Sequence, residues 1–324
     1  MELMRAVRQQ ELGGPEVLAL ADVARPVPGP TEVLVRVLAA GVNPVDWKTR
    51  RAGGMLGAPP FTVGWDVSGV VAGLGRGVTR FRVGDEVYGM PRFPREAGGY
   101  AEYVTGPSRH FARKPTTVDH VAAAGLPLAG LTAWQALVDT AGVGPGARVL
   151  VHAAAGGVGH LAVQLAKARG AYVVGTARAS KHEFVRWAGA DEVIDYTVAD
   201  FTGEVSDCDV VLDPVGGDYT ERSLHVLRTG GLLVSITGVA DPDRLRQVAE
   251  AAGVRTAALL VEPDHAGLEQ LSVLVEQGQL RPHVVATFPL ARAAEAHELG
   301  ETNRTAGKIV LVVRPEGGGG AAPR

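Results

Sequence analysis

The residues with the clearest chemical meaning form a glycine turn within residues 148–170. An apolar run leads into a turn of small residues, and apolar residues spaced as in a helix follow it. The turn carries the pattern G-x-G-x-x-A, in which glycines allow a tight bend and a close approach of the backbone to a pyrophosphate. The free N–H groups at the start of the helix would hold the anion. We therefore predict a dinucleotide site at Gly156, Gly157, Val158 and Gly159, with a purely structural turn as the alternative.

The chain beyond the next strand indicates which dinucleotide is bound. Sheets that bind NAD usually carry an acidic residue about 20 residues past the glycines, where it binds the ribose 2′-hydroxyl. Here the strand that ends at Thr176 is followed by Arg178, Ser180 and Lys181, with no Asp or Glu. A guanidinium pairs well with a 2′-phosphate, whereas a carboxylate would repel it. The sequence favours NADPH over NADH, and two solvated cations at a helix start are the alternative.

A second group of chemically capable side chains lies in residues 41–50, directly after an apolar strand-like run. Asn43, Asp46, Trp47, Lys48 and Arg50 fall within eight positions. We expect a loop here. It is either the lip of an active site, with polar groups projecting from a rigid strand end, or a solvated surface loop.

Three other positions could contact a ligand or support the fold. Asp66 lies between glycines, where capping of a turn is favoured over catalysis. Tyr100 follows a Gly-Gly pair and faces either a pocket or the core. Thr132 is a hydroxyl among apolar neighbours, which either satisfies a helix cap or contacts a ligand.

Two sharp turns that follow apolar strands are candidates for the nicotinamide end of the cofactor. In a doubly wound sheet, ligands gather beyond the carboxyl ends of the strands. Val215 lies in the first of these turns, and Thr237 and Gly238 form the second. Ordinary strand-to-helix turns are the alternative.

The elements that must position these residues differ between the two parts of the chain. Residues 1–120 show short strand-like runs separated by Gly and Pro, which is typical of a compact β-rich domain. The expected strands are 17–20, 32–39, 67–74, 86–89 and 100–105. Residues 121–137 become helical, and strands then alternate with helices as in a parallel sheet. We expect strands at 148–152, 172–176, 192–194, 209–213, 232–236 and 256–261, and helices that include 181–188, 220–227 and 243–252. A helix-like segment at 291–299 precedes a last strand at 308–313, which could rejoin the first domain.

Bulk composition restricts the classes of protein that fit. A chain of 324 residues, 46% hydrophobic and 21% charged, suits a globular protein of about two domains. The net charge of −3 gives no support to nucleic-acid binding. Cys208 stands alone, which excludes an internal disulfide and a cysteine-rich zinc site. No apolar run is long enough for a membrane span, and a cytoplasmic enzyme is expected.

Several stretches, in order along nearly the whole chain, together resemble one family. They include AGVNPVDWK from residue 40, GWDVSG from 64, GDEV from 84, GGYAEY from 98, LTA from 131, AGGVG from 155, DPVGG from 213 and GK at 307. The chain resembles a zinc-independent medium-chain dehydrogenase/reductase of the quinone oxidoreductase and enone reductase branch.

The resemblance implies an α/β fold with two domains. It implies a GroES-like β-rich catalytic domain from residues 1–120 and 284–316, and a doubly wound Rossmann domain that binds NADP from 121–283. Residues 317–324 would form a flexible tail. A homodimer is expected, with a small enone or quinone as substrate and with no nucleic-acid or membrane partner.

The resemblance also implies how the reaction would proceed. Zinc enzymes of the superfamily carry a cysteine and a Gly-His-Glu where this chain has Asp46 and Gly64-Trp65-Asp66, so no metal is expected. Without a Lewis acid, the easier acceptor is a conjugated C=C–C=O or a quinone. The hydride would go to the β-carbon, and a cation or donor would then stabilise the enolate oxygen.

The same resemblance implies roles for several residues whose function cannot be decided from the sequence pattern alone. Lys48 would face the developing oxyanion, Asn43 would orient substrate or nicotinamide, and Tyr100 is a weaker candidate on the substrate side. Two further residues, Tyr196 and Lys308, join the cofactor-binding candidates, and Thr132 would contact the nicotinamide side. Quinone reduction is the first alternative. A structural or RNA-binding protein that holds NADPH is the second, and the absence of a basic stripe argues against it.

Overall fold

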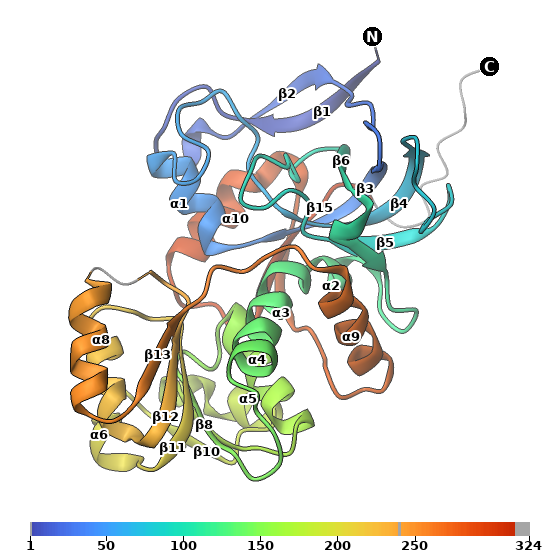
Figure 1. Ribbon diagram of the computed structural model, residues 1–324. Helices are drawn as coiled ribbons and strands as arrows, with labels where there is room; N and C mark the ends of the chain where they lie inside the picture. The colour runs from blue at the N-terminus through green and yellow to red at the C-terminus, as the bar shows by residue number, and fades with distance from the viewer. Residues whose placement is uncertain (1, 239–240, 315–324) are drawn as a thin grey trace. The chain divides into compact units, whose positions relative to one another are not determined.

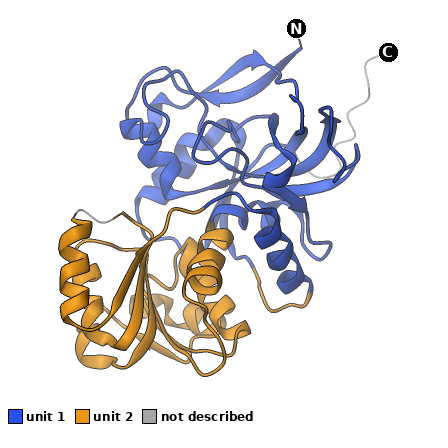
Figure 2. Cartoon of the chain, viewed as in Figure 1, with its two compact units in different colours: residues 1–128, 262–276, 282–324 blue, residues 129–261, 277–281 orange. Residues whose placement is uncertain are grey.

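The computed structural model describes residues 2–238 and 241–314, which divide into two compact units (Figures 1 and 2). The first unit comprises residues 1–128, 262–276 and 282–324, and the second comprises residues 129–261 and 277–281. The expected tail at 317–324 lies outside the described residues. No helix in the described part of the chain is both long and apolar enough to cross a membrane.

The first unit is built mainly of strands. They are β1 (Leu3–Arg8), β2 (Ala19–Ala24), β3 (Glu32–Val42), β4 (Asp66–Leu74), β5 (Glu86–Gly89), β6 (Tyr103–Pro107), β7 (Phe111–Arg113), β14 (Val284–Pro289) and β15 (Lys308–Val312). Its helices are α1 (Pro44–Ala52), α2 (His120–Ala124), α9 (His265–Glu276) and α10 (Ala293–Glu301), with short 3-10 turns η1 (Pro15–Val17), η2 (Ser108–His110) and η6 (Leu290–Arg292).

Strand β3 is the centre of this unit. Among the described residues it pairs antiparallel with β15, β4 and β6 in a seven-stranded sheet. Nearly every residue of β3 is buried, which explains its almost continuous apolar sequence. Because β15 pairs with β3, the end of the chain does rejoin the N-terminal part, as expected. The end of β3 delivers the chain directly into helix α1.

The second unit alternates strands and helices. Its strands are β8 (Arg148–Val151), β9 (Tyr172–Thr176), β10 (Glu192–Ile194), β11 (Cys208–Asp213), β12 (Leu227–Ser235) and β13 (Arg255–Ala258). Its helices are α4 (Gly157–Ala168), α5 (His182–Trp187), α6 (Phe201–Glu204), α7 (Asp218–Arg222) and α8 (Pro242–Ala251), with the short turns η4 (Ala179–Lys181) and η5 (Ser223–Val226). Helix α3 (Pro127–Trp134) begins in the first unit and continues into the π-helical η3 (Gln135–Thr140).

The six described strands of the second unit form one parallel sheet in the order β10-β9-β8-β11-β12-β13. This is the order of a doubly wound sheet, in which the direction of winding reverses between β8 and β11. Ligands of such sheets bind outside the carboxyl ends of the strands at this reversal. The glycine turn lies at the end of β8, and Asp213 ends β11, so both candidate regions are at the reversal.

Most expected elements are confirmed, and the main difference concerns residues 41–50. Residues 172–176 and 192–194 form strands as expected, and the last strand runs over Lys308–Val312. The predicted loop at 41–50 is instead the end of β3 followed by helix α1. Asn43 is its N-cap and Pro44 occupies the first helical position, which is a helix-start pattern. Residues 15–17 form a 3-10 turn, so the first expected strand begins later, at Ala19.

Helix α9 shows why the units differ from the domain boundaries expected at 120 and 284. The Tyr88 hydroxyl on β5 donates to the backbone oxygen of Leu268 on α9 over 2.5 Å. This contact and the packing of α9 on β7 group residues 262–276 with the first unit. Residues 121–128 join it as well, because α2 packs on β3 and β4.

The tight pairing of β3 and β4 predicts a position that tolerates no side chain. A Cβ on Gly69 would lie 2.1 Å from the backbone oxygen of Arg36 on β3. Overpacking of this kind costs about 1–3 kcal/mol, so Gly69→Ala should lower the urea midpoint of unfolding. The matched control is Gly73→Ala on the same strand, whose Cβ would meet nothing closer than 3.6 Å. Equal midpoints for the two variants would contradict this reading of the sheet.

Candidate active site

The first turn of α1 is fixed by the residue at its third position. The Asp46 Oδ2 atom accepts a hydrogen bond from the Asn43 backbone N–H over 2.7 Å. The Asp46 N–H in turn donates to the Asn43 backbone oxygen over 2.9 Å. These two bonds satisfy groups that a helix start otherwise leaves unpaired. The side chains of both residues are buried.

The Asn43 side chain connects two buried charges. Its Nδ2 donates to Asp66 Oδ2 over 2.8 Å, and its Oδ1 accepts from the Lys308 ammonium. The Lys308 Nζ lies 3.5 Å from the same carboxylate oxygen. Asp66 Oδ1 accepts from the Leu128 N–H over 2.7 Å. Residues far apart in the sequence thus meet in one buried polar cluster in the first unit. Both the nitrogen and the oxygen of the Asn43 side-chain amide have hydrogen-bond partners in it.

A second line of contacts reaches Asp46 from α10. The Tyr100 hydroxyl donates to Asp46 Oδ2 over 2.9 Å and lies 3.1 Å from His297 Nε2. His297 Nδ1 lies 3.2 Å from Arg50 Nη1, and Arg50 Nη2 donates to Glu301 over 2.8 Å. We refer to the hydrogen-bonded series Asp46, Tyr100, His297, Arg50 and Glu301 as the α10 chain. Tyr100 is therefore fully buried in a network and is not an open pocket tyrosine.

Burial dominates the acid–base behaviour of this cluster. It raises the pKa of the Asp46 carboxyl to about 7, although the bonds from Asn43 and Tyr100 act in the opposite direction. Burial also raises the pKa of Asp66 and lowers that of Lys308, and the charge of each opposes the shift of the other. Asp66 and Lys308 can thus remain an ion pair, whereas no Lys or Arg in the described part of the chain forms an ion pair with Asp46.

Lys48 stands apart from this cluster. It lies on α1, two positions after Asp46, with its side chain exposed. Lys308, which we expected to bind cofactor, is the lysine that joins Asn43 in the buried cluster. Of the three substrate-side candidates, only Lys48 presents its polar group to solvent.

The residues at the positions of zinc ligands in the superfamily do not fit a zinc ion. Both oxygens of Asp66 and the Oδ2 atom of Asp46 accept hydrogen bonds, and the Lys308 ammonium at Asp66 would repel a second cation. Trp65 carries no ligand atom, since its indole N–H donates to the Arg95 oxygen over 2.7 Å. Within residues 2–238 and 241–314, no three His, Cys, Asp or Glu side chains gather as a metal site.

In the second unit, the glycine turn brings α4 close to the chain that leaves β8. A Cβ on Gly159 would lie 2.3 Å from the Ala153 oxygen and 2.8 Å from the Ala154 Cα. Only glycine permits this approach, which is the role expected for it. Gly156 is the N-cap of α4, and Gly157, Val158 and Gly159 form its first turn. No acidic side chain lies in that turn, so its N–H groups and dipole suit an anion.

Thr176 supports the turn from the end of β9. Its Oγ1 accepts from the N–H of Ala153 over 3.2 Å, and Ala153 adopts the left-handed region with a φ of 45°. The imidazole of His152 lies between Thr176 Oγ1 at 3.2 Å and Ser223 Oγ at 2.9 Å. Burial lowers the pKa of His152 to about 4, which keeps the ring neutral. Thr176 is buried, so the structure gives it contacts inside the turn.

The cationic residues after β9 remain at the surface and close together. Arg178 Nε donates to the Tyr196 hydroxyl over 3.0 Å, so the structure does bring these two candidates into contact. Burial and the charge of Arg178 lower the pKa of Lys181. Ser180 is exposed beside them. The Asp195 carboxylate also lies in this region and accepts a hydrogen bond from the Ala179 N–H over 3.0 Å. The sequence did not indicate this contact, because the two residues are 16 positions apart.

The other cofactor-side candidates lie at strand ends or on α3. Asp213 Oδ1 accepts from the N–H groups of Val215 and Gly216, each over 2.9 Å, which shapes the turn after β11. A Cβ on Gly216 would lie 2.6 Å from Thr237 Oγ1, so this turn and the one after β12 are neighbours. Gly238 has a φ of 79°. Thr132 is buried on α3.

The sequence did not indicate that His297 belongs to this network or that Arg50 connects His297 with Glu301. A lone histidine on α10 gives no signal, because its partners lie more than 190 residues away. The role of Asp46 had a signal, since Asn-Pro-x-Asp matches a helix start with an acid at its third position.

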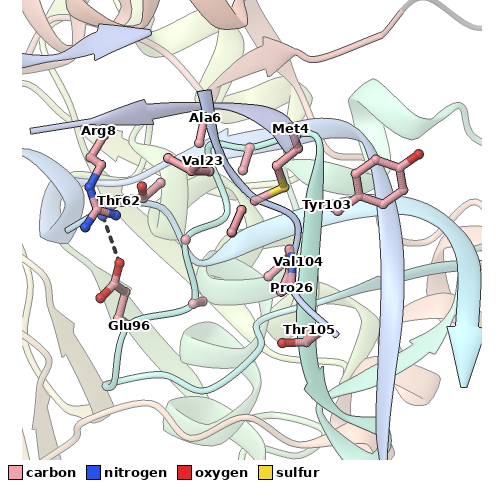
Figure 3. A pocket seen from close by; sticks show the side chains of 14 residues that line it. Met4, Ala6, Arg8, Val23, Pro26, Thr62, Glu96, Tyr103, Val104 and Thr105 are labelled. Carbon is pink, nitrogen blue, oxygen red and sulfur yellow. Dashed lines mark hydrogen bonds between the residues drawn. The ribbon is translucent and has the colours of Figure 1, made fainter. Parts of the chain in front are cut away.

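The first unit also contains a cavity of about 470 Å³. It is lined by β1, β2, β6 and residues 96–98, with Arg8 and Glu96 pointing toward each other at one end (Figure 3). Asn43, Lys48 and Tyr100 do not line it. The segment 90–97 contributes Glu96 and Ala97 to this lining.

Comparison with known families gives two matches along the chain. Residues 29–116 match the model of the alcohol dehydrogenase GroES-like domain, and residues 188–311 match that of the zinc-binding dehydrogenases. The first match includes Asn43, Lys48 and Asp66, and the second includes Lys308.

Relatives of similar length extend these matches. An NADPH-dependent alkenal/one oxidoreductase of Arabidopsis thaliana, described as chloroplastic, is 36% identical over 96% of this chain and 80% of its own. A 2-haloacrylate reductase from Burkholderia sp is 36% identical over 93% of this chain and 96% of its own. The solved quinone oxidoreductase from Coxiella burnetii has a TM-score of 0.91 at 38% identity, over 97% of this chain and 100% of that one.

Proposed function

This chain belongs to the quinone oxidoreductase and enone reductase branch of the medium-chain dehydrogenase/reductases, and we propose that it is an NADPH-dependent reductase of α,β-unsaturated carbonyl compounds. The observation that carries the proposal is the pair of cations Arg178 and Lys181 directly after β9, in a segment that itself contains no acidic residue, combined with an exposed lysine on α1. Alkenals, alkenones and acrylates share a C=C bond conjugated to a carbonyl. The names of two relatives therefore support this acceptor class.

The residues of the second unit fit the cofactor. Gly156, Gly157, Val158 and Gly159 would receive the pyrophosphate at the start of α4, where Gly159 lets the helix lie close to the chain that leaves β8. Arg178, with Ser180, Lys181 and Tyr196, would bind the 2′-phosphate, because a guanidinium offers a two-point contact. NADPH supplies a hydride when it is bound. Thr132, Val215, Thr237 and Gly238 would line the nicotinamide end, and Thr176 would act through the shape of the turn.

Residues of the first unit would stabilise the negative charge that develops on the substrate. Reduction at the β-carbon shifts negative charge to the carbonyl oxygen, and a nearby cation stabilises it. Lys48 would supply that cation, because Lys308 is already engaged with Asn43 and Asp66. Asn43 and Tyr100 are engaged in the buried network, so they would support α1 and act on the substrate indirectly. Water can supply the proton for the α-carbon.

Quinone reduction is the second candidate, and a specific observation favours it. The solved structure with a TM-score of 0.91 is a quinone oxidoreductase. A quinone also needs a donor at its oxygen after hydride transfer, so the same lysine could serve both acceptors. A semiquinone signal in spin resonance would distinguish one-electron quinone reduction from hydride transfer to an enone.

Three finer statements complete the proposal. The reaction proceeds without a metal, which is supported by the ammonium at Asp66 and the absence of a ligand atom on Trp65. The enzyme acts in the cytoplasm, in keeping with its single, buried cysteine. It acts as a homodimer with a small-molecule substrate, as the sequence resemblance implies.

Replacement of Arg178 tests the assignment of the cofactor. Loss of a charged contact to phosphate costs about 1.5–3 kcal/mol, which corresponds to roughly a 10- to 100-fold weaker affinity. Arg178→Ala should raise the dissociation constant for NADPH by that factor and leave NADH binding unchanged, as measured by fluorescence titration. Arg186→Ala on α5, also exposed, is the matched control and should change neither constant. Equal losses for NADPH and NADH in Arg178→Ala would remove it from the 2′-phosphate site.

Replacement of Lys48 tests the role of the exposed lysine. Removing a donor to a developing oxyanion costs up to about 10²–10³ in kcat, and an exposed group should cost less, about 10- to 100-fold. We expect Lys48→Ala to slow single-turnover oxidation of NADPH by a small alkenone to that extent. Affinity for NADPH should remain unchanged.

Lys48→Arg provides the control, because it keeps the positive charge at the same helical position. It should retain a larger part of the rate than Lys48→Ala. Intact turnover in Lys48→Ala would show that this side chain has no part in the chemistry.

A further inference from the structure

The hydrogen-bond donors around the Asp46 carboxyl are distributed unequally between its two oxygens. Oδ2 receives both the Asn43 N–H, at 2.7 Å, and the Tyr100 hydroxyl, at 2.9 Å. Oδ1 is buried and has no hydrogen-bond partner among the described residues. A carboxylate spreads its charge over both oxygens, and each then needs donors. In a neutral acid Oδ2 would be the carbonyl oxygen and Oδ1 would carry the proton. That O–H has no acceptor among the described residues, but an unpaired hydroxyl costs less to bury than an unpaired charge, so the arrangement favours the neutral acid.

The direction of the α10 chain supports this assignment. A guanidinium can only donate, so His297 Nδ1 must accept from Arg50. The neutral imidazole then carries its proton on Nε2 and donates it to the Tyr100 oxygen. Tyr100 is left with its own proton directed at Asp46 Oδ2. Burial, reinforced by the charge of Arg50, lowers the pKa of His297 to about 3, so the ring stays neutral and every donor in the chain keeps its direction.

The charged groups nearest Asp46 are already paired with one another. On β4 and β15, Asp66 is paired with Lys308. On α1 and α10, Glu301 is paired with the fully buried Arg50 over 2.8 Å and also with the more exposed Arg51 over 2.7 Å. Ionised Asp46 would add an unpaired negative charge beside Asp66 in the interior, which is costly. The field at the start of α1 favours the anion, but its effect is small beside the cost of complete burial.

We propose that Asp46 is held as a neutral carboxylic acid in the folded protein and that this form positions the first turn of α1, with Asn43 and Lys48. Asp46 is thus a positioning residue, since it is fully buried and acts through the helix start. Its effect on catalysis rests on the function proposed for Lys48, whereas its protonation does not.

The proposal determines how stability depends on pH. The pKa of an aspartate in an unfolded chain is about 4, and burial raises that of folded Asp46 to about 7. The folded protein therefore holds one more proton than the unfolded chain between these values. By linkage, the stability contributed by this group falls as pH rises through that window and stays at its lower level above it.

Asp46→Asn tests this directly, because the amide keeps an acceptor oxygen and cannot ionise. Urea unfolding should be followed in wild type, Asp46→Asn and the exposed control Asp22→Asn, from about pH 5 to about pH 8. We expect the wild type and Asp22→Asn to lose stability relative to Asp46→Asn as pH rises. Parallel curves for wild type and Asp46→Asn would overturn the proposal. Unfolding is measured without any assay of catalysis, so the result tests the protonation of Asp46 separately from the proposed function.

Two further measurements keep the proposal testable if Asp46→Asn does not fold. Tyr100→Phe removes a donor to Oδ2 and leaves the anion less stabilised, so the pH-dependent loss of stability should move to higher pH; a move to lower pH overturns the proposal. Infrared spectra of the wild type should show the C=O stretch of a buried carboxylic acid at neutral pH. Its disappearance at alkaline pH should coincide with a fall in kcat/KM. Absence of that stretch at neutral pH would show that Asp46 is ionised and overturn the proposal.

Discussion

The first unit depends on one buried polar contact, in which Asn43 connects the Asp66 carboxylate with the Lys308 ammonium. Breaking a buried ion pair on one side typically costs about 3–5 kcal/mol, because the remaining charge is left unpaired. The contact therefore fixes the relative places of β4, β15 and the end of β3. It also decides where α1 starts, since Asn43 is both the bridge and the N-cap. Lys48 is carried by that helix and needs no buried partner of its own.

The second unit depends on a steric constraint. Gly159 brings α4 so close to the segment after β8 that no side chain fits between them. Thr176 holds the same segment from the side of β9 through Ala153. The result is a helix start free of acidic side chains near the place where the parallel sheet reverses its winding. Under the proposed function, this helix start is a preformed site for the pyrophosphate, and the cations after β9 would favour NADPH over NADH.

Much of this could be predicted from the sequence, for identifiable reasons. The parallel sheet was predictable because β8, β9 and β11 are apolar runs bounded by turns, and the glycine pattern marks one of those turns. Arg178 was named from the charges after β9 and Tyr196 from the family resemblance, and the structure brings the two into contact. Helix α1 was mistaken for a loop, because its many polar side chains suggested exposure. In fact Asp46 and Arg50 are buried. The roles of His297 and Lys308 could not be predicted, since each depends on partners more than 190 residues away.

The destination of the hydride tests the proposed chemistry most directly. NADPH deuterated at the transferring position of its nicotinamide would be incubated with a small alkenone, and the product examined by NMR. We predict deuterium at the β-carbon of a saturated ketone, with a proton from solvent at the α-carbon. Deuterium at the carbonyl carbon of an allylic alcohol, or a reduced product without deuterium, would contradict reduction of the conjugated C=C bond by this enzyme.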